Sequence, residues 1–183
     1  MTGSKRRPHV DPARLDAAAV EVASIAEGEH VRVALIGGYA MQHYGSERLT
    51  GDLDVAATDR IRGLPRGKAL SFGGEQTRAR NKVPVDVVVR SDDYADLYED
   101  AIESAQRIRG VPLPVARPEH LAAMKMVAGR ARDEMDLGFL ISSGQLDLKR
   151  AKAIIKKHLG RYAVTEFERI VDETKWKASR GRI

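Results

Sequence analysis

The stretch LIGGYAMQHYGSERLTGDLDVA, residues 35–56, decides the fold, because it joins an apolar run to a glycine pair and then to two aspartates. Asp52 and Asp54 are separated only by Leu53 in a run that otherwise suits a buried strand. Successive side chains of a strand point to opposite faces, so both carboxylates share one face, about 6 to 7 Å apart. This pattern indicates a functional site, and the alternative is a solvated edge strand with outward polar residues.

Strands and helices alternate around this stretch. Hydrophobic periodicity, caps and turn residues predict, in chain order, a helix over 11–29, a strand over 31–36, a short helix over 39–45, a strand over 52–57, a hairpin turn at 73–74, a strand over 83–90, a helix over 92–105, an extended segment over 107–116 and four helices over 118–129, 131–142, 147–159 and 165–177. The order predicts an α/β (α+β) protein with a mixed sheet flanked by helices and a helical C-terminal third.

Length and composition bound the organisation of the chain. Its 183 residues fit one domain, or one domain with a small helical appendage, and the absence of cysteine excludes disulfides, zinc ribbons and thiol nucleophiles. No apolar run approaches the roughly 18 residues that a membrane span needs, and no hydrophobic segment follows the first ten residues, so we expect a cytoplasmic protein without a membrane partner. The net charge of +5 is compatible with a polyanionic partner but does not establish one.

A third carboxylate stands in the run VPVDVVVR, residues 83–90. Alternate valines of this run share one face, and Asp86 stands on the other. If this strand lies beside the strand of Asp52 and Asp54, all three carboxylates emerge together and repel one another unless cations neutralise them. Mg²⁺ or Mn²⁺ suits such oxygen ligands, and two such ions assist in-line displacement at a phosphoryl centre. The alternative for Asp86 is a strand-end role or a salt bridge with Arg90.

The glycine pair, Gly37 and Gly38, falls where a strand passes into a helix. Backbone N–H groups at such a place can surround phosphate oxygens without obstruction by Cβ atoms. A glycine pair alone more often makes a tight turn. Its position directly upstream of the paired aspartates favours phosphate binding here.

These residues resemble the nucleotidyltransferase superfamily, whose fold carries a glycine pair after the first strand and two aspartates on the following one. The stretch GGYAMQHYGSERLTGDLDV is similar to the form of the signature with Arg-x-Thr-x-Asp-x-Asp, in which Arg48 and Thr50 precede the two aspartates. The third family carboxylate matches Asp86. Tyr39 departs from the pattern, because the family often has a small residue near this point.

The resemblance covers roughly residues 31–145. RPEHLAAMKMVAGRARDEMDLGFL, residues 117–140, is similar to the helical segment of small stand-alone nucleotidyltransferases, including abortive-infection and toxin–antitoxin toxins. In those proteins a lysine approaches the nucleotide phosphates and an aspartate supports the site, and the best matches are Lys125 and Asp136. On an unbroken helix these two residues would share a face, although Gly129 could interrupt it. Asp136 could instead pair with Arg132 at i, i+4.

The resemblance implies four segments. They are a flexible basic N-terminus (1–10), a nucleotidyltransferase-like catalytic core (11–116), a helical C-terminal segment packed on the core (117–177) and a basic tail (178–183). The chain ends in KWKASRGRI, residues 175–183, which carries four positive charges and Trp176. This ending could line an RNA path with Trp176 as a stacking surface, or it could be a frayed end with one packed indole. The lysines at 149, 152 and 156 predict a solvated basic helix face. A chain of this length is not expected to hold a large acceptor-binding domain of the kind that polymerases carry.

The resemblance also implies a reaction: transfer of a nucleoside monophosphate from an NTP, with ATP binding expected, and release of pyrophosphate. Asp52, Asp54 and Asp86 would hold two Mg²⁺ (or Mn²⁺) ions, with Asp86 acting as or beside the general base. Gly37, Gly38, Lys125 and Asp136 would serve the nucleotide, and Arg48 and Thr50 would either contact it or orient the loop.

The resemblance leaves the acceptor open. It could be an RNA 3′ end, a protein hydroxyl or a small molecule such as an aminoglycoside, and RNA or protein is favoured. A cognate antitoxin is an expected partner if the protein is a toxin. The competing functions are a catalytically inactive binding or regulatory module of the same fold, and a plain metal- or phosphate-binding scaffold.

Overall fold

The structure is a computed structural model that describes residues 8–181. The chain divides into two compact units. The first holds the described residues up to His43 together with Glu47–Ala116, and the second holds Tyr44–Ser46 and the chain from Arg117 onward. Of the predicted basic N-terminus and basic tail, residues 1–7 and 182–183 lie outside the described residues.

The first unit is built on a five-stranded mixed sheet with the strand order β1-β2-β5-β4-β3. The strands are β1 (Val33–Ile36), β2 (Leu53–Ala57), β3 (Lys68–Ala69), β4 (Glu75–Arg78) and β5 (Pro84–Val88). β2 pairs antiparallel with β1 and parallel with β5, and β4 pairs antiparallel with both β5 and β3. The predicted turn at Gly73 and Gly74 connects β3 to β4 as a hairpin. The mixed sheet confirms the predicted fold class.

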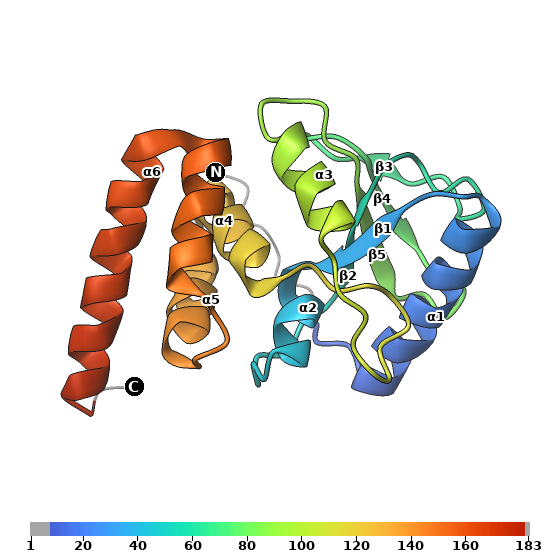
Figure 1. The fold of residues 1–183 in the computed structure, drawn as a ribbon. Coiled ribbons are helices and arrows are strands. Elements are labelled where there is room, and N and C mark those ends of the chain that lie inside the picture. The colour runs from blue at the N-terminus through green and yellow to red at the C-terminus, as the bar shows by residue number, and fades with distance from the viewer. Residues whose placement is uncertain (1–7, 182–183) are drawn as a thin grey trace, which may run out of the picture. The chain divides into compact units, whose positions relative to one another are not determined.

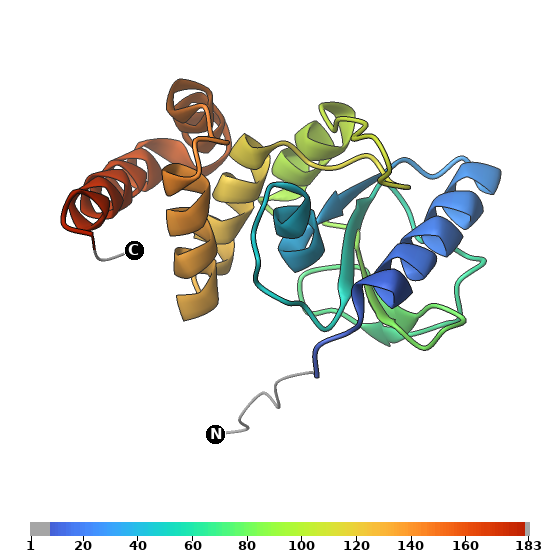
Figure 2. The same ribbon diagram turned by 90° about the horizontal axis from the view of Figure 1, so that it is seen from below.

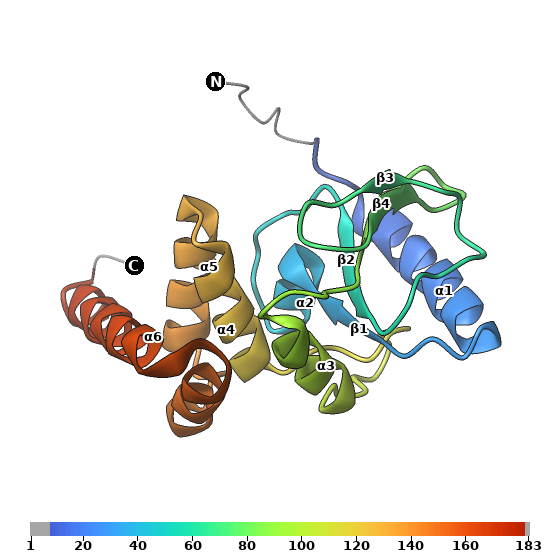
Figure 3. The same cartoon turned by 90° about the horizontal axis from the view of Figure 1, so that it is seen from above.

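Three helices accompany the sheet: α1 (Pro12–Gly28), α2 (Gly37–His43) and α3 (Ala95–Glu103). β2 and β5 lie between α1 on one side and α3 on the other (Figures 1 and 3). Asp11 caps α1 as the sequence predicts, because its Oδ1 accepts a hydrogen bond of 2.9 Å from the backbone N–H of Ala13. The valines and leucines that alternate with the aspartates on β2 and β5 are fully buried and form the core of this unit.

One register places the carboxylates side by side. Ile36, Asp54, Asp86, Gln76 and Lys68 are successive partners across β1, β2, β5, β4 and β3, and we call them the cross-sheet row. Residues directly opposite each other on neighbouring strands share a face of the sheet. The two aspartates of the row therefore project together, as the alternation in the sequence predicts.

The second unit contains α4 (Pro118–Ala128), α5 (Ala131–Ser142) and α6 (Leu148–Ser179). Gly129, with φ of +58°, ends α4, so the helix is interrupted where the sequence allows it. Two helices are predicted over 147–159 and 165–177, and α6 does consist of two helices, which meet at a kink where Gly160 has non-helical backbone angles (φ 84°, ψ −179°). Its two arms diverge, in orange and red, in Figure 2. Within residues 8–181, no helix combines the length and apolar character that a bilayer crossing requires.

Trp176 lies in the last turns of α6 and is half exposed. The guanidinium of Arg180 lies 4.3 Å from the centroid of its ring. A cation over an indole face is a stabilising contact, so one face of the ring is occupied by the residue that follows the helix.

Candidate functional site

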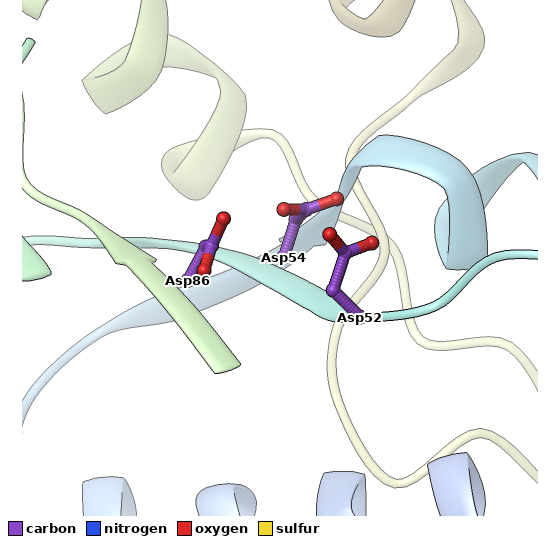
Figure 4. Close-up of side chains that lie close together, drawn as sticks. All are labelled: Asp52, Asp54 and Asp86. Atoms are coloured by element: carbon purple, nitrogen blue, oxygen red, sulfur yellow. The ribbon is translucent and has the colours of Figure 1, made fainter. Parts of the chain in front are cut away.

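Three carboxylates form a cluster on one face of the first unit's sheet. Asp52, Asp54 and Asp86 each offer an oxygen, and these oxygens all lie within 4.8 Å of one another. The three side chains rise from the same side of β2 and β5 in Figure 4. Two unit charges at this distance repel by about 3.5 kcal/mol at the effective dielectric constant of about 20 that suits half-buried groups. A divalent cation with several oxygen ligands relieves that repulsion, so this donor set fits Mg²⁺ or Mn²⁺.

Two uncharged side chains orient the cluster from its edges. Thr50, only 6% exposed, donates a hydrogen bond of 2.9 Å from its hydroxyl to Asp52 Oδ1. Gln76 on β4 donates one of 2.9 Å from Nε2 to Asp86 Oδ1. Thr50 is thus directed at the cluster and helps to position it, in line with the interpretation that it orients the loop. Sequence reasoning missed Gln76, because its place opposite Asp86 depends on the register of the hairpin.

The glycine pair lies directly against the carboxylates. A Cβ atom on Gly37 would stand 2.0 Å from Asp54 Oδ2, and φ at Gly37 is +67°, a conformation that side chains disfavour. A Cβ atom on Gly38 would stand 2.8 Å from Thr50 Oγ1 and 3.0 Å from Arg48 Nη2. The pair therefore does more than make a turn, since only glycine lets the start of α2 approach the site so closely.

The tyrosine that departs from the family pattern points away from this approach. Tyr39 is 3% exposed, and its hydroxyl donates a hydrogen bond to Asp16 on α1. Burial, together with the hydrogen bond to Asp16 and the charge of that residue, raises the pKa of Tyr39 well above its ordinary value. The bulky ring is thus part of the packed interior of the first unit. The loop after α2 is held by Gln42, whose Nε2 donates a hydrogen bond of 2.8 Å to the carbonyl of Arg48.

Arg90, the proposed salt-bridge partner of Asp86, pairs with another residue. Arg90 forms its ion pair with Asp92, at 2.6 Å between Nη2 and Oδ2. Its guanidinium also lies 5.1 to 5.2 Å from the ring centroids of three aromatic residues, Phe72, Tyr94 and Tyr98. Arg90 is thus held by residues beyond the end of β5, and Asp86 stays with the cluster.

Lys125 and Asp136 belong to the second unit and meet there. Lys125 Nζ lies 2.5 Å from Asp136 Oδ2 and 3.1 Å from Asp133 Oδ1, and all three side chains are buried. Gly129 separates α4 from α5, the interruption that the sequence allows, so the contact is made between two helices and not along one face of a single helix. Asp136 pairs with Lys125, whereas Arg132, its i, i+4 neighbour, is exposed. The roles of Lys125 and Asp136 toward a nucleotide stay predictions.

Asp133 is the member of this buried group that sequence reasoning missed. It also accepts a hydrogen bond of 2.5 Å from Nε of Arg130, the residue before α5. Burial raises the pKa of Asp133, but the hydrogen bonds and charges of Arg130 and Lys125 outweigh burial and hold that pKa below its ordinary value. The i, i+3 spacing of Arg130 and Asp133 is the sequence signal that could have identified it.

Comparisons with known proteins agree with this architecture. No protein-family model matches the sequence, and no curated protein matches it. Among solved structures, the antibiotic-resistance factor ANT(2″)-Ia is similar with a TM-score of 0.55 and 15% identity, over 87% of this chain and 98% of that one.

Two further structures are less similar. An antigenic nucleotidyltransferase-like protein from Paracoccidioides brasiliensis has a TM-score of 0.48 and 14% identity, over 86% of this chain and 95% of that one. A CCA-adding enzyme in complex with CTP has a TM-score of 0.35 and 13% identity, over 91% of this chain and 52% of that one. At such identities the likeness to ANT(2″)-Ia establishes the fold alone.

Proposed function

We propose that this chain, which has a nucleotidyltransferase-like fold, is a metal-dependent nucleotidyltransferase that transfers a nucleoside monophosphate from an NTP to an acceptor hydroxyl. The observation that carries the proposal is the cluster of Asp52, Asp54 and Asp86 on one sheet face, with Gly37 packed against it. Three carboxylates this close are unfavourable in a protein without cations to neutralise them. A catalytically inactive protein of this fold would have no reason to keep three carboxylates that repel one another.

The cluster would hold the metal through one oxygen from each aspartate, with two Mg²⁺ or Mn²⁺ ions expected. Bound divalent metal supplies Lewis acidity at the reacting phosphoryl group and neutralises the cluster. Thr50 and Gln76 each hold one carboxylate oxygen by a hydrogen bond, so the remaining coordination is preorganised before any ligand arrives. Support of this kind in other metal sites is worth about 10- to 100-fold in affinity or activity.

The proposed reaction is a single displacement at phosphorus. The acceptor oxygen forms a bond to the α-phosphorus of the NTP, and the bond from that phosphorus to the oxygen bridging the β-phosphate breaks. The electron pair leaves with pyrophosphate, and the hydroxyl proton passes to Asp86, acting as or beside the general base. Gly37 lies against Asp54, and Gly38 lies against Thr50 and Arg48. The backbone N–H groups of both glycines and the side chain of Arg48 are assigned to the nucleotide phosphates. Lys125 and Asp136 keep their proposed nucleotide role on resemblance alone.

A labelled-nucleotide assay tests the proposal. Each α-labelled NTP, ATP first, would be incubated with the protein, Mg²⁺ or Mn²⁺ and a lysate separated into RNA, protein and small-molecule fractions. Label should appear in one fraction and vanish with Asp54→Asn, but persist with Asp93→Asn, a matched change at an exposed aspartate of the same unit. The absence of label from all fractions with both metals would favour the inactive binding module.

The second, finer proposal is that the protein is the toxin of a toxin–antitoxin pair. It rests on the similarity of residues 117–140 to the helical segment of such toxins. Induced expression should then arrest growth of a host, and Asp54→Asn should remove the arrest. Growth at the same rate with either form would contradict the toxin proposal while leaving the transferase proposal intact.

A further inference from the structure

A basic cavity of about 630 Å³ lies within the first unit, at the end of the sheet where β2 and β5 begin. Its lining includes residues from the start of α1, the loop before β3, the end of β4 and the turn before β5. Six of them are basic: His9, Arg14, Arg66, Lys68, Arg78 and Lys82. Asp and Glu are absent from the described residues that line it. We refer to this feature as the basic cavity.

Most of its positive charge is not neutralised by the protein. Within residues 8–181, Arg66, Lys68, Arg78 and Lys82 take part in no ion pair. Other arginines of the same unit do have carboxylate partners: Arg32, Arg60, Arg80 and Arg90. Like charges gathered around a concave surface repel one another and raise the local concentration of anions. The cavity is therefore suited to a ligand that carries several negative charges.

The backbone at Lys82 adds a second observation. Lys82 has φ of +65°, and His30 is the other non-glycine residue with positive φ in the described chain. Glycine or asparagine is favoured at such a position, and a lysine there is conformationally costly. The presence of lysine at this position, in spite of the conformational cost, favours a function for the positive charge of Lys82 at the edge of the cavity.

The three aspartates do not line the basic cavity, but one lining residue links it to the carboxylate cluster. Gln76 lines the cavity and donates the hydrogen bond of 2.9 Å to Asp86. Lys68, which also lines it, stands in the cross-sheet row two strands from Asp86, so the two Cα atoms lie about 10 Å apart. Gly51, another lining residue, directly precedes Asp52. The cavity is thus linked to the cluster through Gln76 on the Asp86 side, whereas Gly37 lies against the cluster on the Asp54 side.

We propose that the basic cavity binds the phosphodiester backbone of the acceptor, and that the acceptor is a single-stranded nucleic acid whose terminal hydroxyl lies at Asp86. The inference rests on the proposed function and specifies its acceptor. Cations contributed by four separate segments suit several successive phosphates better than one compact anion. A polycationic acceptor such as an aminoglycoside is disfavoured by the same charges.

The lining also predicts how the strand is recognised. Phe, Tyr and Trp are absent from the described lining residues, so no aromatic surface is offered for base stacking. Contacts to phosphates position a nucleic acid without reading its sequence. The acceptor site should therefore accept strands of different base composition with similar affinity and should be sensitive to salt.

Binding of fluorescent single-stranded RNA and DNA oligonucleotides to the full chain, measured across a salt series, tests the cavity. Three phosphate contacts predict a slope of log affinity against log salt of about −2, and a loss of about 20-fold between about 50 and 200 mM salt. Removing one contact should reduce the slope by about 0.7. Arg78→Glu should weaken binding, whereas Arg62→Glu, an equal charge change at an exposed position outside the cavity, should not.

A second variant guards against misfolding. Lys82→Gly removes the charge and puts at this position a residue that adopts a positive φ without steric cost. The variant should therefore fold at least as stably as the wild type and still bind the oligonucleotide more weakly. Equal affinities of wild type, Arg78→Glu and Lys82→Gly would overturn the inference. A loss of affinity with Lys156→Glu on α6, and none with the cavity variants, would overturn it in favour of the basic helix face.

Transfer assays separate this inference from the proposed function. Label moving from the NTP to the oligonucleotide, with KM for the oligonucleotide raised by Arg78→Glu and kcat little changed, supports both. Label appearing only in protein or small molecules overturns the acceptor assignment and retains the transferase. Salt-dependent oligonucleotide binding without label in any fraction overturns the transferase and leaves the cavity as a nucleic-acid-binding site.

Discussion

Replacing Asp54 by asparagine should stabilise the metal-free protein while removing its response to metal. Asp54 stands between Asp52, two residues earlier on the chain, and Asp86, its partner on β5. With oxygens within 4.8 Å of one another, each charged pair costs about 3.5 kcal/mol at an effective dielectric constant of about 20. Neutralising Asp54 removes two of the three pairs. Solvent and salt screening of these half-buried groups reduces the expected gain to about 1 to 3 kcal/mol.

Urea unfolding in chelator and in Mg²⁺ or Mn²⁺ measures both effects. In chelator, Asp54→Asn should unfold at a higher urea concentration than the wild type, because asparagine keeps the shape of the side chain without its charge. With metal at about 100 times its Kd, the wild type should gain about 2.7 kcal/mol and the variant little. The ranking of the two proteins should therefore reverse on adding metal.

The control for this experiment is Asp93→Asn, at an exposed aspartate of the same unit. It should leave both the stability in chelator and the gain from metal unchanged. A variant at position 54 that is less stable than the wild type in chelator would refute the argument from repulsion. A wild type that gains nothing from either metal would refute the metal site itself.

Three further changes test other contacts. Gly37→Ala places a Cβ atom 2.0 Å from Asp54 Oδ2, so it should displace that carboxylate and abolish the metal-induced stabilisation measured by urea unfolding. Thr50→Val should weaken metal binding by about 10- to 100-fold in calorimetric titration, and Thr50→Ser should restore it, because the serine hydroxyl still donates. Lys125→Met leaves two carboxylates buried without their ammonium partner and should cost about 3 to 5 kcal/mol of stability. The pKa of Asp133 is lower in the folded protein than its ordinary value of about 3.8. The ionised Asp133 therefore contributes its full stabilisation above about pH 3.8, and this stabilisation is lost as the pH falls below that value. The unfolding midpoint, measured across an acid titration, should show the loss.

The carboxylate cluster could be predicted from sequence because it follows from one rule applied twice. Alternation along each strand places Asp52, Asp54 and Asp86 opposite the buried leucine and valines. The sequence left it as a condition that the two strands are neighbours, and the parallel pairing of β2 and β5 in the structure meets that condition. The glycine pair was predictable for a similar reason, since it marks the point where the chain turns from strand to helix. Its contact with Asp54, however, is a tertiary distance that spacing does not encode.

What escaped prediction depends on registers and helix packing between distant segments. Gln76 reaches Asp86 because the hairpin fixes β4 against β5, and no local pattern specifies that register. Lys125 meets Asp133 because α4 ends at Gly129 and α5 packs back on it, and the sequence predicts the two helices but not how they pack. The cations of the basic cavity come from four segments between residues 9 and 82, so they are scattered in the sequence and adjacent only in the fold.

The opposite charges of the cluster and the basic cavity constrain the function together. Negative charge concentrated at Asp52, Asp54 and Asp86 calls for bound cations, and positive charge concentrated at the cavity calls for an anion. The two regions could neutralise each other directly, but Gln76, an uncharged residue, stands between Asp86 and Lys68 in the cross-sheet row. A site that keeps both charges separate is prepared for two ligands of opposite sign. A metal-bound triphosphate beside the glycine pair and a phosphodiester strand in the basic cavity meet that requirement. A protein that only binds a metal or only binds phosphate would need one of the two charged regions, not both.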